Sequence, residues 1–159
     1  MNARSFGNDS TLVVKVGGTQ GVNFAAVCAD VADLVSQGKR LVLVHGGSTE
    51  ANRLGEQLNI PPRFITSPSG YTSRYTDRNT LEVFLMAVNG KINALLVEQL
   101  RQLGVNALGL SGLDGGLLRA SRREKVVCVG NGKRKVLHGD YTGRIEQVNL
   151  PLLHLLLDG

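Results

Sequence analysis

The chain has 159 residues, the length of one ordinary domain, and its 42% hydrophobic and 19% charged content exclude a disordered polar chain. No apolar run reaches membrane-spanning length, and residues 1–10 lack the apolar core of a secretory signal, so we expect a flexible polar leader and a cytoplasmic protein without membrane contact. The net charge of +5 favours acidic partners. Cys28 and Cys128 have no metal-ligand spacing and are predicted to be small core residues.

The first sixty residues alternate between strand and helix patterns. Short apolar runs at 12–16 and 41–44 predict buried strands, and each is followed at once by a glycine pair. Apolar residues at helical spacing predict a helix over 24–35, and Ser48 or Thr49 can cap a second helix. This order predicts the α/β class: a three-layer αβα sandwich with a mainly parallel open sheet and right-handed crossovers.

The next segment contains the longest helical pattern. A hairpin-like stretch over 64–71 precedes Thr76 and Asp77, which are typical of a helix start. One apolar stripe then continues until Gly104, so we expect a single long helix. Residues 105–110 predict a further strand.

The pattern changes after residue 117. Short β-like runs flank Gly130-Asn131-Gly132, a strong turn signal, so residues 117–137 predict an antiparallel hairpin that projects from the parallel core. Residues 149–157 predict the beginning of another amphipathic helix.

Two glycine pairs form the candidate ligand-binding edge. Gly17-Gly18 and Gly46-Gly47 follow consecutive predicted parallel strands, and the carboxyl ends of such strands are where ligands bind. Glycine lets a phosphate or carboxylate approach the backbone, and N–H groups at a helix start attract anions. Lys15 lies two residues before the first pair, and we favour a phosphate contact for it over a side chain that merely extends to solvent. The chain has no phosphate-binding P-loop motif and no dinucleotide fingerprint.

Arg74 is the second charged candidate. It precedes the long helix, where a guanidinium can bind a carboxylate bidentately, and pairing with Asp77 on the surface is an equally supported alternative. For His45 a structural hydrogen bond is favoured over a general-base role, because a carboxylate substrate is already ionised. We assign no metal to protein ligands.

The predicted hairpin region concentrates positive charge, with one acid, Glu124, among the bases. A solvated surface is the ordinary explanation, and nucleic acid is a possible partner, but interleaved aromatic residues are absent and an acidic protein or peptide fits better. The basic residues are Arg119, Arg122, Arg123, Lys125, Lys133, Arg134 and Lys135.

In order and with matching gaps, TLVVKVGGT, LVLVHGGS and SGYTSRYTD resemble the amino-acid kinase family, in particular its acetylglutamate kinase branch. The resemblance implies a carbamate-kinase-like fold and phosphorylation of a carboxylate by ATP, with Mg²⁺ carried by the nucleotide. It implies that Lys15 contacts the transferring phosphoryl group and that Gly17 and Gly18 line the phosphate path. The other glycine pair would hold the substrate through backbone N–H groups, and Arg74 would bind its carboxylate.

Two further stretches, NALGLSGLDGGLL and HGDYTGRIEQVN, are similar to the LysW-aminoadipate kinases of lysine biosynthesis. Those enzymes phosphorylate aminoadipate, or glutamate in a related arginine route, attached to a small acidic carrier protein. The resemblance implies that the basic hairpin docks the carrier. Ser48 replaces a third glycine common in plain acetylglutamate kinases, and Tyr71-Thr72-Ser73 replaces a leucine-containing stretch.

The family resemblance also sets the expected domain organisation. Residues 11–159 would be the N-terminal substrate-binding domain, followed in family members by an ATP-binding half, so we expect this chain to be inactive alone and its enzyme to be a homodimer. The alternatives are a kinase for free N-acetylglutamate, a related kinase for aspartate or a carbamate, and, from another class, a non-catalytic α/β module that binds nucleic acid.

Overall fold

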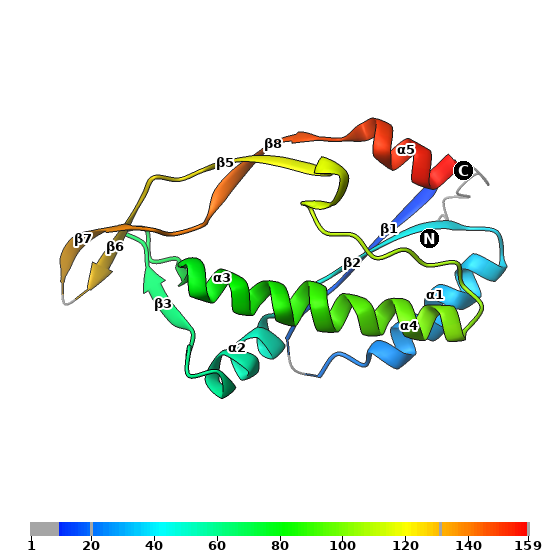
Figure 1. Cartoon of the computed structure of the whole chain (residues 1–159), viewed down its shortest axis with the longest axis horizontal. Coiled ribbons are helices and arrows are strands. Elements are labelled where there is room, and N and C mark those ends of the chain that lie inside the picture. The colour runs from blue at the N-terminus through cyan, green and yellow to red at the C-terminus, as the bar shows by residue number, and fades with distance from the viewer. Residues whose placement is uncertain (1–9, 20, 131, 159) are drawn as a thin grey trace, which may run out of the picture.

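A computed structural model of the chain describes residues 10–19, 21–130 and 132–158 (Figure 1). The leader predicted for residues 1–10 lies outside the described residues except for Ser10, as does Asn131 of the predicted turn. The α/β class is confirmed: helices and strands alternate through the first half, and antiparallel strands dominate the second.

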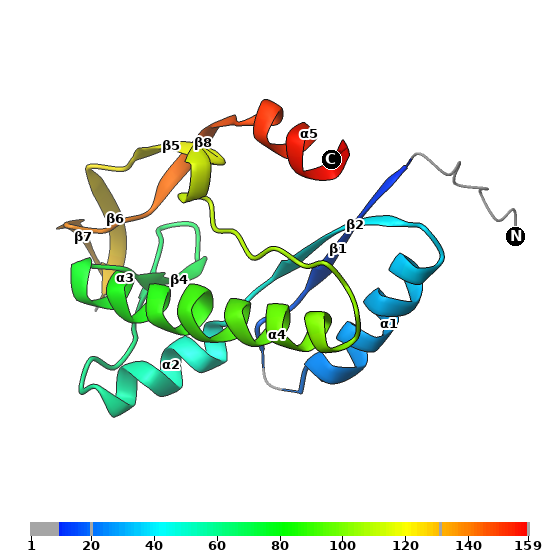
Figure 2. The same cartoon turned by 45° about the vertical axis from the view of Figure 1, so that its right-hand side comes forward.

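The parallel core is a strand pair with helices packed on one face. β1 (Thr11–Val16) pairs in parallel with β2 (Arg40–His45), and α1 (Phe24–Ser36) connects them. The side chain of Asn23 caps α1 by accepting from the backbone N–H of Ala26 at 3.1 Å. Figure 2 shows α1 and α4 on one side of this pair and α5 on the other.

One long helix forms the side of the core that faces α1 and the strand pair. It runs without a break from α3 (Arg78–Leu85) through a π-helical segment η1 (Met86–Asn93) to α4 (Ala94–Gln102), as the single apolar stripe predicts. Asp77 caps it by accepting from Thr80 N at 2.9 Å, and this bond lowers the pKa of the Asp77 carboxyl. By length and composition alone the helix could span a membrane, which is weak evidence because buried helices of soluble proteins have the same character.

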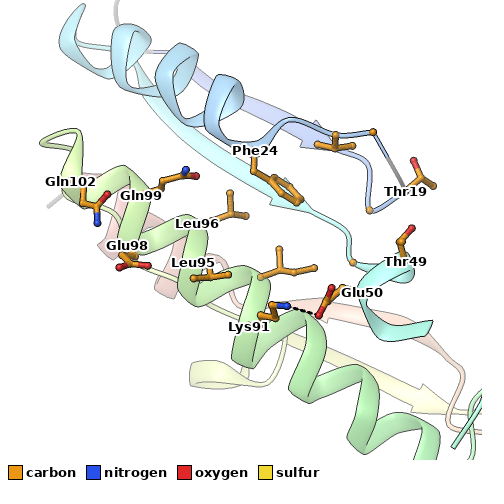
Figure 3. A pocket seen from close by; sticks show the side chains of 15 residues that line it. Thr19, Phe24, Thr49, Glu50, Lys91, Leu95, Leu96, Glu98, Gln99 and Gln102 are labelled. Carbon is orange, nitrogen blue, oxygen red and sulfur yellow. Dashed lines mark hydrogen bonds and ion pairs between the residues drawn. The ribbon is translucent and has the colours of Figure 1, made fainter. Parts of the chain in front are cut away.

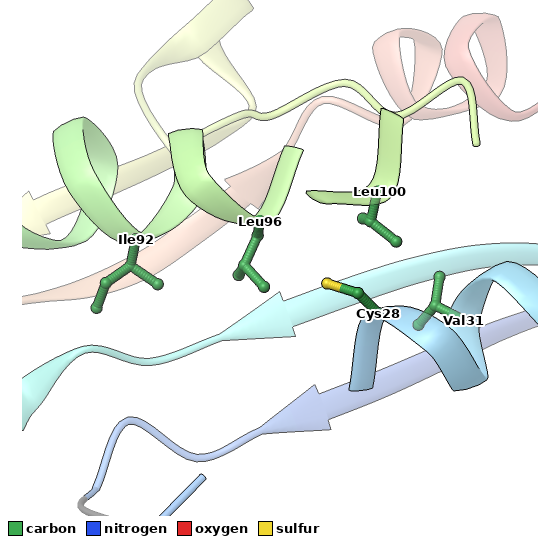
Figure 4. Close-up of a cluster of buried hydrophobic side chains, with 5 residues drawn as sticks. All are labelled: Cys28, Val31, Ile92, Leu96 and Leu100. Atoms are coloured by element: carbon green, nitrogen blue, oxygen red, sulfur yellow. The ribbon is translucent and has the colours of Figure 1, made fainter. Parts of the chain in front are cut away.

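The largest buried cluster lies between α1, α4 and the parallel pair (Figure 4). Cys28 is fully buried there, which raises the pKa of its thiol and makes it a poor nucleophile. Cys28 and Cys128 are both buried and unpaired, as the sequence predicts. The buried members of the cluster are Cys28, Val31, Ile92, Leu96 and Leu100.

The predicted strand over residues 105–110 is wrong. The segment forms no ladder; Ala107 N donates to the carbonyl of Val105 at 2.9 Å, and both side chains pack against the core cluster. An apolar run that packs as an extended loop has the same sequence pattern as a buried strand. Parallel pairing is therefore confined, within the described residues, to β1 and β2, so the expectation of a mainly parallel sheet is corrected.

The remaining strands form two antiparallel sheets. β3 (Arg63–Thr66) and β4 (Thr72–Tyr75) make the hairpin expected near residues 64–71. β6 (Lys125–Gly130) and β7 (Lys133–His138) form a hairpin around the predicted turn, and it joins the first in the order β4-β3-β6-β7. The predicted hairpin over 117–137 was too long, because residues 118–122 pair instead with residues 143–148.

The second antiparallel sheet leads into the last helix. β5 (Leu118–Arg122) pairs with β8 (Gly143–Val148), and a short 3₁₀ turn η2 (Asp114–Gly116) precedes β5. The predicted last helix is confirmed as α5 (Leu150–Asp158), with Asn149 Oδ1 accepting from Leu152 N at 3.2 Å.

Candidate active site

The two glycine loops touch each other, backbone against backbone. The carbonyl oxygen of Gly18 accepts hydrogen bonds from Thr49 N and Ser48 Oγ, both at 3.1 Å. A Cβ atom added to Gly18 would lie 2.0 Å from Gly47 N, and one added to Gly46 would lie 2.7 Å from Gly18 N. Only glycine permits this approach, so the sequence-predicted pairs are brought together at one sheet edge.

The second loop leaves a helix start open. α2 (Ser48–Gln57) has Gly47 as its N-cap, with no side chain bonded to its first N–H groups. Ser48 and Thr49, the predicted caps, instead bond to Gly18 through a hydroxyl and a backbone N–H. Thr49 N is thus satisfied by a backbone carbonyl, and no side chain caps the start of α2, an arrangement that can accept an anion beside Thr49.

Lys15 lies beside the loops but on the outer face of β1. It is exposed and registers with Val44 of β2, on the same face as Val13 and opposite to the core helices. Its backbone position places it two residues before Gly17, at the carboxyl end of the strand, where a phosphate between strand end and glycine loop would meet it.

Arg74 lies against the start of α2. Its guanidinium Nη2 donates to the carbonyl of Ser48 at a long 3.5 Å, and its Cζ is 5.5 Å from the ring centroid of Phe64 and 5.9 Å from that of Phe84. Burial lowers the pKa of this guanidinium, which still remains charged at neutral pH. Asp77, the alternative partner, caps the long helix instead. The fold thus brings a partly desolvated cation to the open helix start.

A pocket opens behind these loops. It has a volume of about 530 Å³ and contains Gly18 and Gly47, but neither Lys15 nor Arg74 lines it. In Figure 3 the Glu50 carboxylate faces Lys91 across it, with Nζ and Oε1 2.7 Å apart. The pocket is therefore a hollow on the core side of the loops that reaches Gly18 and Gly47 but not the two candidate cations.

The basic residues of the β6–β7 hairpin are exposed, and they point to both of its faces. Lys135 pairs with the buried Cys128, which places Lys135 and Lys133 on one face. Lys125 and Arg134 lie on the other face, beside half-exposed valines. The predicted single basic surface is thus divided between two sides of one ribbon.

The basic residues near β5 are less uniform. Arg119, Arg122 and Arg123 are all exposed, but the guanidinium of Arg122 is also bonded to its own turn. Its Nε donates to the carbonyl of Asp140 at 2.8 Å, and its guanidinium lies 3.7 Å from the ring centroid of Tyr141. Arg122 is therefore better placed to support this turn than to meet a partner.

A hydrogen-bonded seam between residues 75–76 and 138–142, in which Tyr75 and Asp140 are buried, was missed in the sequence. Asp140 is 2% exposed, and its oxygens accept from Thr76 N at 3.0 Å and Thr142 N at 2.7 Å. Tyr141 N donates to the Thr76 carbonyl at 2.7 Å, and Tyr75 OH donates to the His138 carbonyl at 2.5 Å. In the sequence, the local signal was the turn-forming pair Gly139-Asp140. In the structure, Gly139 has a φ of +86°.

Two smaller predictions concern histidine and metal. His45 Nδ1 lies 3.2 Å from the carbonyl of Gly46, in agreement with a structural hydrogen bond. Within the described part of the chain, no group of three or more His, Cys, Asp or Glu side chains could hold a metal ion.

The fold and sequence have relatives of known family. The model of the amino acid kinase family matches residues 10–159. The chain is 58% identical over 146 residues to a LysW-aminoadipate kinase of Deinococcus radiodurans and 55% identical over 146 residues to one of Thermus thermophilus. It is 37% identical over 147 residues to a LysW-aminoadipate/LysW-glutamate kinase of Saccharolobus solfataricus.

Each alignment spans 92% of this chain but 50%, 54% and 54% of those proteins, so the chain spans about half the length of the relatives it matches. Among solved structures, the smu.665 protein of Streptococcus mutans has a TM-score of 0.64 at 24% identity, over 93% of this chain and 54% of that one. N-acetylglutamate synthase from Neisseria gonorrhoeae has a TM-score of 0.56 at 22% identity, over 93% of this chain and 33% of that one. The resemblance predicted from the three motifs is confirmed, and the chain belongs to the amino acid kinase family.

Proposed function

We propose that this chain is the substrate-binding part of an ATP-dependent kinase that phosphorylates a side-chain carboxylate. The substrate is α-aminoadipate, or glutamate, carried on a small acidic protein. The observation that carries the proposal is the position of Arg74 against the open start of α2, next to Gly46 and Gly47. A guanidinium and a helix start without a side-chain cap together favour a substrate with two carboxylates.

In the proposed reaction, the side-chain carboxylate attacks the γ-phosphoryl group in line, giving an acyl phosphate and ADP. The attacking group is ionised, so no general base is needed. Arg74 and the second glycine loop hold the substrate; Gly46 N already donates to the carbonyl of Val16 at 3.1 Å, so Gly47 N is the proposed donor. Lys15 stabilises charge on the transferring group, with Gly17 and Gly18 beside the phosphates. Mg²⁺ would enter bound to the nucleotide and would neutralise charge on its phosphate oxygens.

Two observations support the carrier. The relatives with 58% and 55% identity are named for a LysW-linked substrate. Independently, the projecting β6–β7 hairpin exposes four basic side chains, which can meet an acidic surface through long-range attraction. We place the docking contact on the face of Lys133 and Lys135, with Lys125 and Arg134 on the other face and Arg119 and Arg123 near β5 adding to the long-range attraction.

The proposal extends to the rest of the enzyme. Because the relatives are about twice as long, we assign the adenine and ribose site to a second half and propose that residues 11–159 alone are inactive. We also propose a cytoplasmic homodimer. The long helix exposes Met86, Leu95 and Leu103 by about half, which suits contact with a second copy.

The test is calorimetric titration of the full-length enzyme at low and high salt with two ligands: free N-acetylglutamate, and the acidic carrier bearing aminoadipate. Salt-sensitive binding of the carrier form alone is the expected result. A double substitution, Lys133→Gln with Lys135→Gln, should weaken that binding about tenfold and reduce its salt dependence. The matched control, Lys39→Gln with Arg101→Gln, removes the same charge elsewhere and should change little.

The competing functions give different titrations. Binding of free N-acetylglutamate without preference for the carrier would make the chain part of an acetylglutamate kinase. Nucleic-acid binding that weakens steeply with salt and is unchanged by Lys15→Ala would favour the non-catalytic module. Equal binding by the hairpin variant and its control would remove the hairpin from the docking surface.

A further inference from the structure

We infer that Asp140 is a positioning residue that links the carrier-docking hairpin to the substrate arginine, an inference that rests on the proposed function. Asp140 is nearly fully buried in a turn between β7 and β8. It lies 64 positions along the chain from Thr76, whose N–H it accepts at 3.0 Å. Two residues before Thr76 is Arg74, so this bond fixes the backbone that carries the proposed carboxylate ligand.

The turn holds the same backbone from both sides. Tyr141 N donates to the carbonyl of Thr76 at 2.7 Å, so both backbone polar groups of Thr76 are bonded to residues 140 and 141. One residue earlier, Tyr75 OH donates to the carbonyl of His138. Tyr75 is itself 8% exposed. Three hydrogen bonds thus join the end of β4 to the turn that follows β7.

The other end of the turn connects to the antiparallel pair β5–β8. Asp140 Oδ1 accepts from Thr142 N at 2.7 Å, and the Asp140 carbonyl accepts from Arg122 Nε at 2.8 Å. Arg123 N donates to the Thr142 carbonyl at 2.9 Å. One buried side chain therefore lies where the ends of β7 and β5, the start of β8 and the strand of Arg74 converge.

This convergence gives the residue a role in the reaction. A carrier-linked substrate gains from tethering only when the docking surface and the carboxylate ligand keep a fixed separation, because a poor match of distances lowers the effective concentration at the site. β3 joins the hairpin to the strand of Arg74 through one pair at Thr66 and Val129, and Asp140 adds a second connection by bonding the backbone beside Arg74 to the base of the hairpin. A substrate without a carrier does not use this link.

The test compares two substrates of the full-length enzyme: carrier-linked aminoadipate and N-acetyl-aminoadipate. The readout is the ratio of their kcat/KM values. Asp140→Asn keeps the shape but replaces one acceptor oxygen by a donor that faces a backbone N–H, and it should lower the ratio about tenfold. The matched control is Asp114→Asn, since Asp114 also accepts from a backbone N–H, that of Ser111 at 2.6 Å, but lies outside the seam. It should leave the ratio unchanged.

The outcomes separate this inference from the function on which it rests. If the wild-type ratio is near one, the carrier proposal fails, and the inference fails with it. If the wild type prefers the carrier-linked substrate and Asp140→Asn slows both substrates equally, Asp140 is only structural and the inference alone is overturned. Should Asp140→Asn not fold, Tyr75→Phe removes one hydrogen bond of the same seam and should lower the ratio about threefold. An unchanged ratio in that variant would also overturn the inference.

Discussion

Replacing Gly18 by alanine tests the contact between the two glycine loops. The new Cβ would lie 2.0 Å from Gly47 N and 2.5 Å from the carbonyl carbon of Gly46, whereas ordinary contact begins at 3.4 Å. Both atoms belong to backbone, so no side chain can rotate away, and the loops must separate by roughly 1 Å.

Two effects should follow in the full-length enzyme. Overpacking of this kind costs about 1–3 kcal/mol of folding free energy, and Tm should fall by about 2–4 °C for each kcal/mol. A 1 Å displacement of the groups that hold substrate and phosphate should lower kcat/KM about 10²-fold. Differential scanning calorimetry and steady-state kinetics measure the two.

Gly90→Ala is the matched control, because its Cβ would meet nothing closer than 3.9 Å and lies in a helical segment. It should preserve Tm or raise it slightly. If Gly18→Ala behaved like this control, with Tm within about 1 °C and kcat/KM within about threefold of the wild type, the loops would not be in contact and the reasoning would be wrong.

Three further predictions concern charged residues. Lys15→Ala in the full-length enzyme should lower turnover by roughly 10²–10³, and a loss below about threefold would contradict its phosphate role. Arg74→Lys should raise KM for the carboxylate substrate about tenfold or more, because a lysine cannot bind bidentately; an unchanged KM would place the substrate elsewhere. The Glu50 carboxyl has a pKa of about 2, lowered from 4.5 mainly by its hydrogen bond from Arg53 and then by that from Lys91. Since its folded pKa is the lower one, its stabilisation is present above about pH 4.5 and is lost as pH falls towards 2. Both cations are about half exposed, so the full contribution is only about 1 kcal/mol. The Tm difference between wild type and Glu50→Gln should therefore shrink from pH 7 to pH 3, and an equal difference at both would exclude the ion pairs as its cause.

Sequence patterns predicted those parts of the fold whose determining residues lie close together in the chain. β1 and its glycine pair, α1 and the long helix were predicted because apolar spacing, caps and glycine stops lie within a few residues of one another. The same signals placed Gly18 and Gly46 at one edge, although their direct contact depends on the register of β1 against β2.

The parts that were missed depend on distant partners. An apolar run such as residues 105–110 pairs as a strand only if another backbone is available, and here its side chains pack without pairing. The Asp140–Thr76 bond joins positions 64 residues apart, and no local sequence pattern near either residue predicts the other as its partner. The π-helical turns within the long helix also have no signature in its apolar stripe.

The outer face of β1 has a consequence for motion. Within the described residues β2 is the one strand that pairs with β1, and Val13 on the outer face of β1 is 70% exposed. A strand held along one edge and packed on one face opens more often than the helices behind it, so its amide hydrogens should exchange with solvent sooner than those of α1. Lys15 lies on this strand, so motion of the β1 backbone also displaces its ammonium group. Any element that covers Val13 or pairs with the free edge of β1 would restrict the positions that the Lys15 ammonium samples. The ammonium would then lie near the phosphoryl group for a larger fraction of the time.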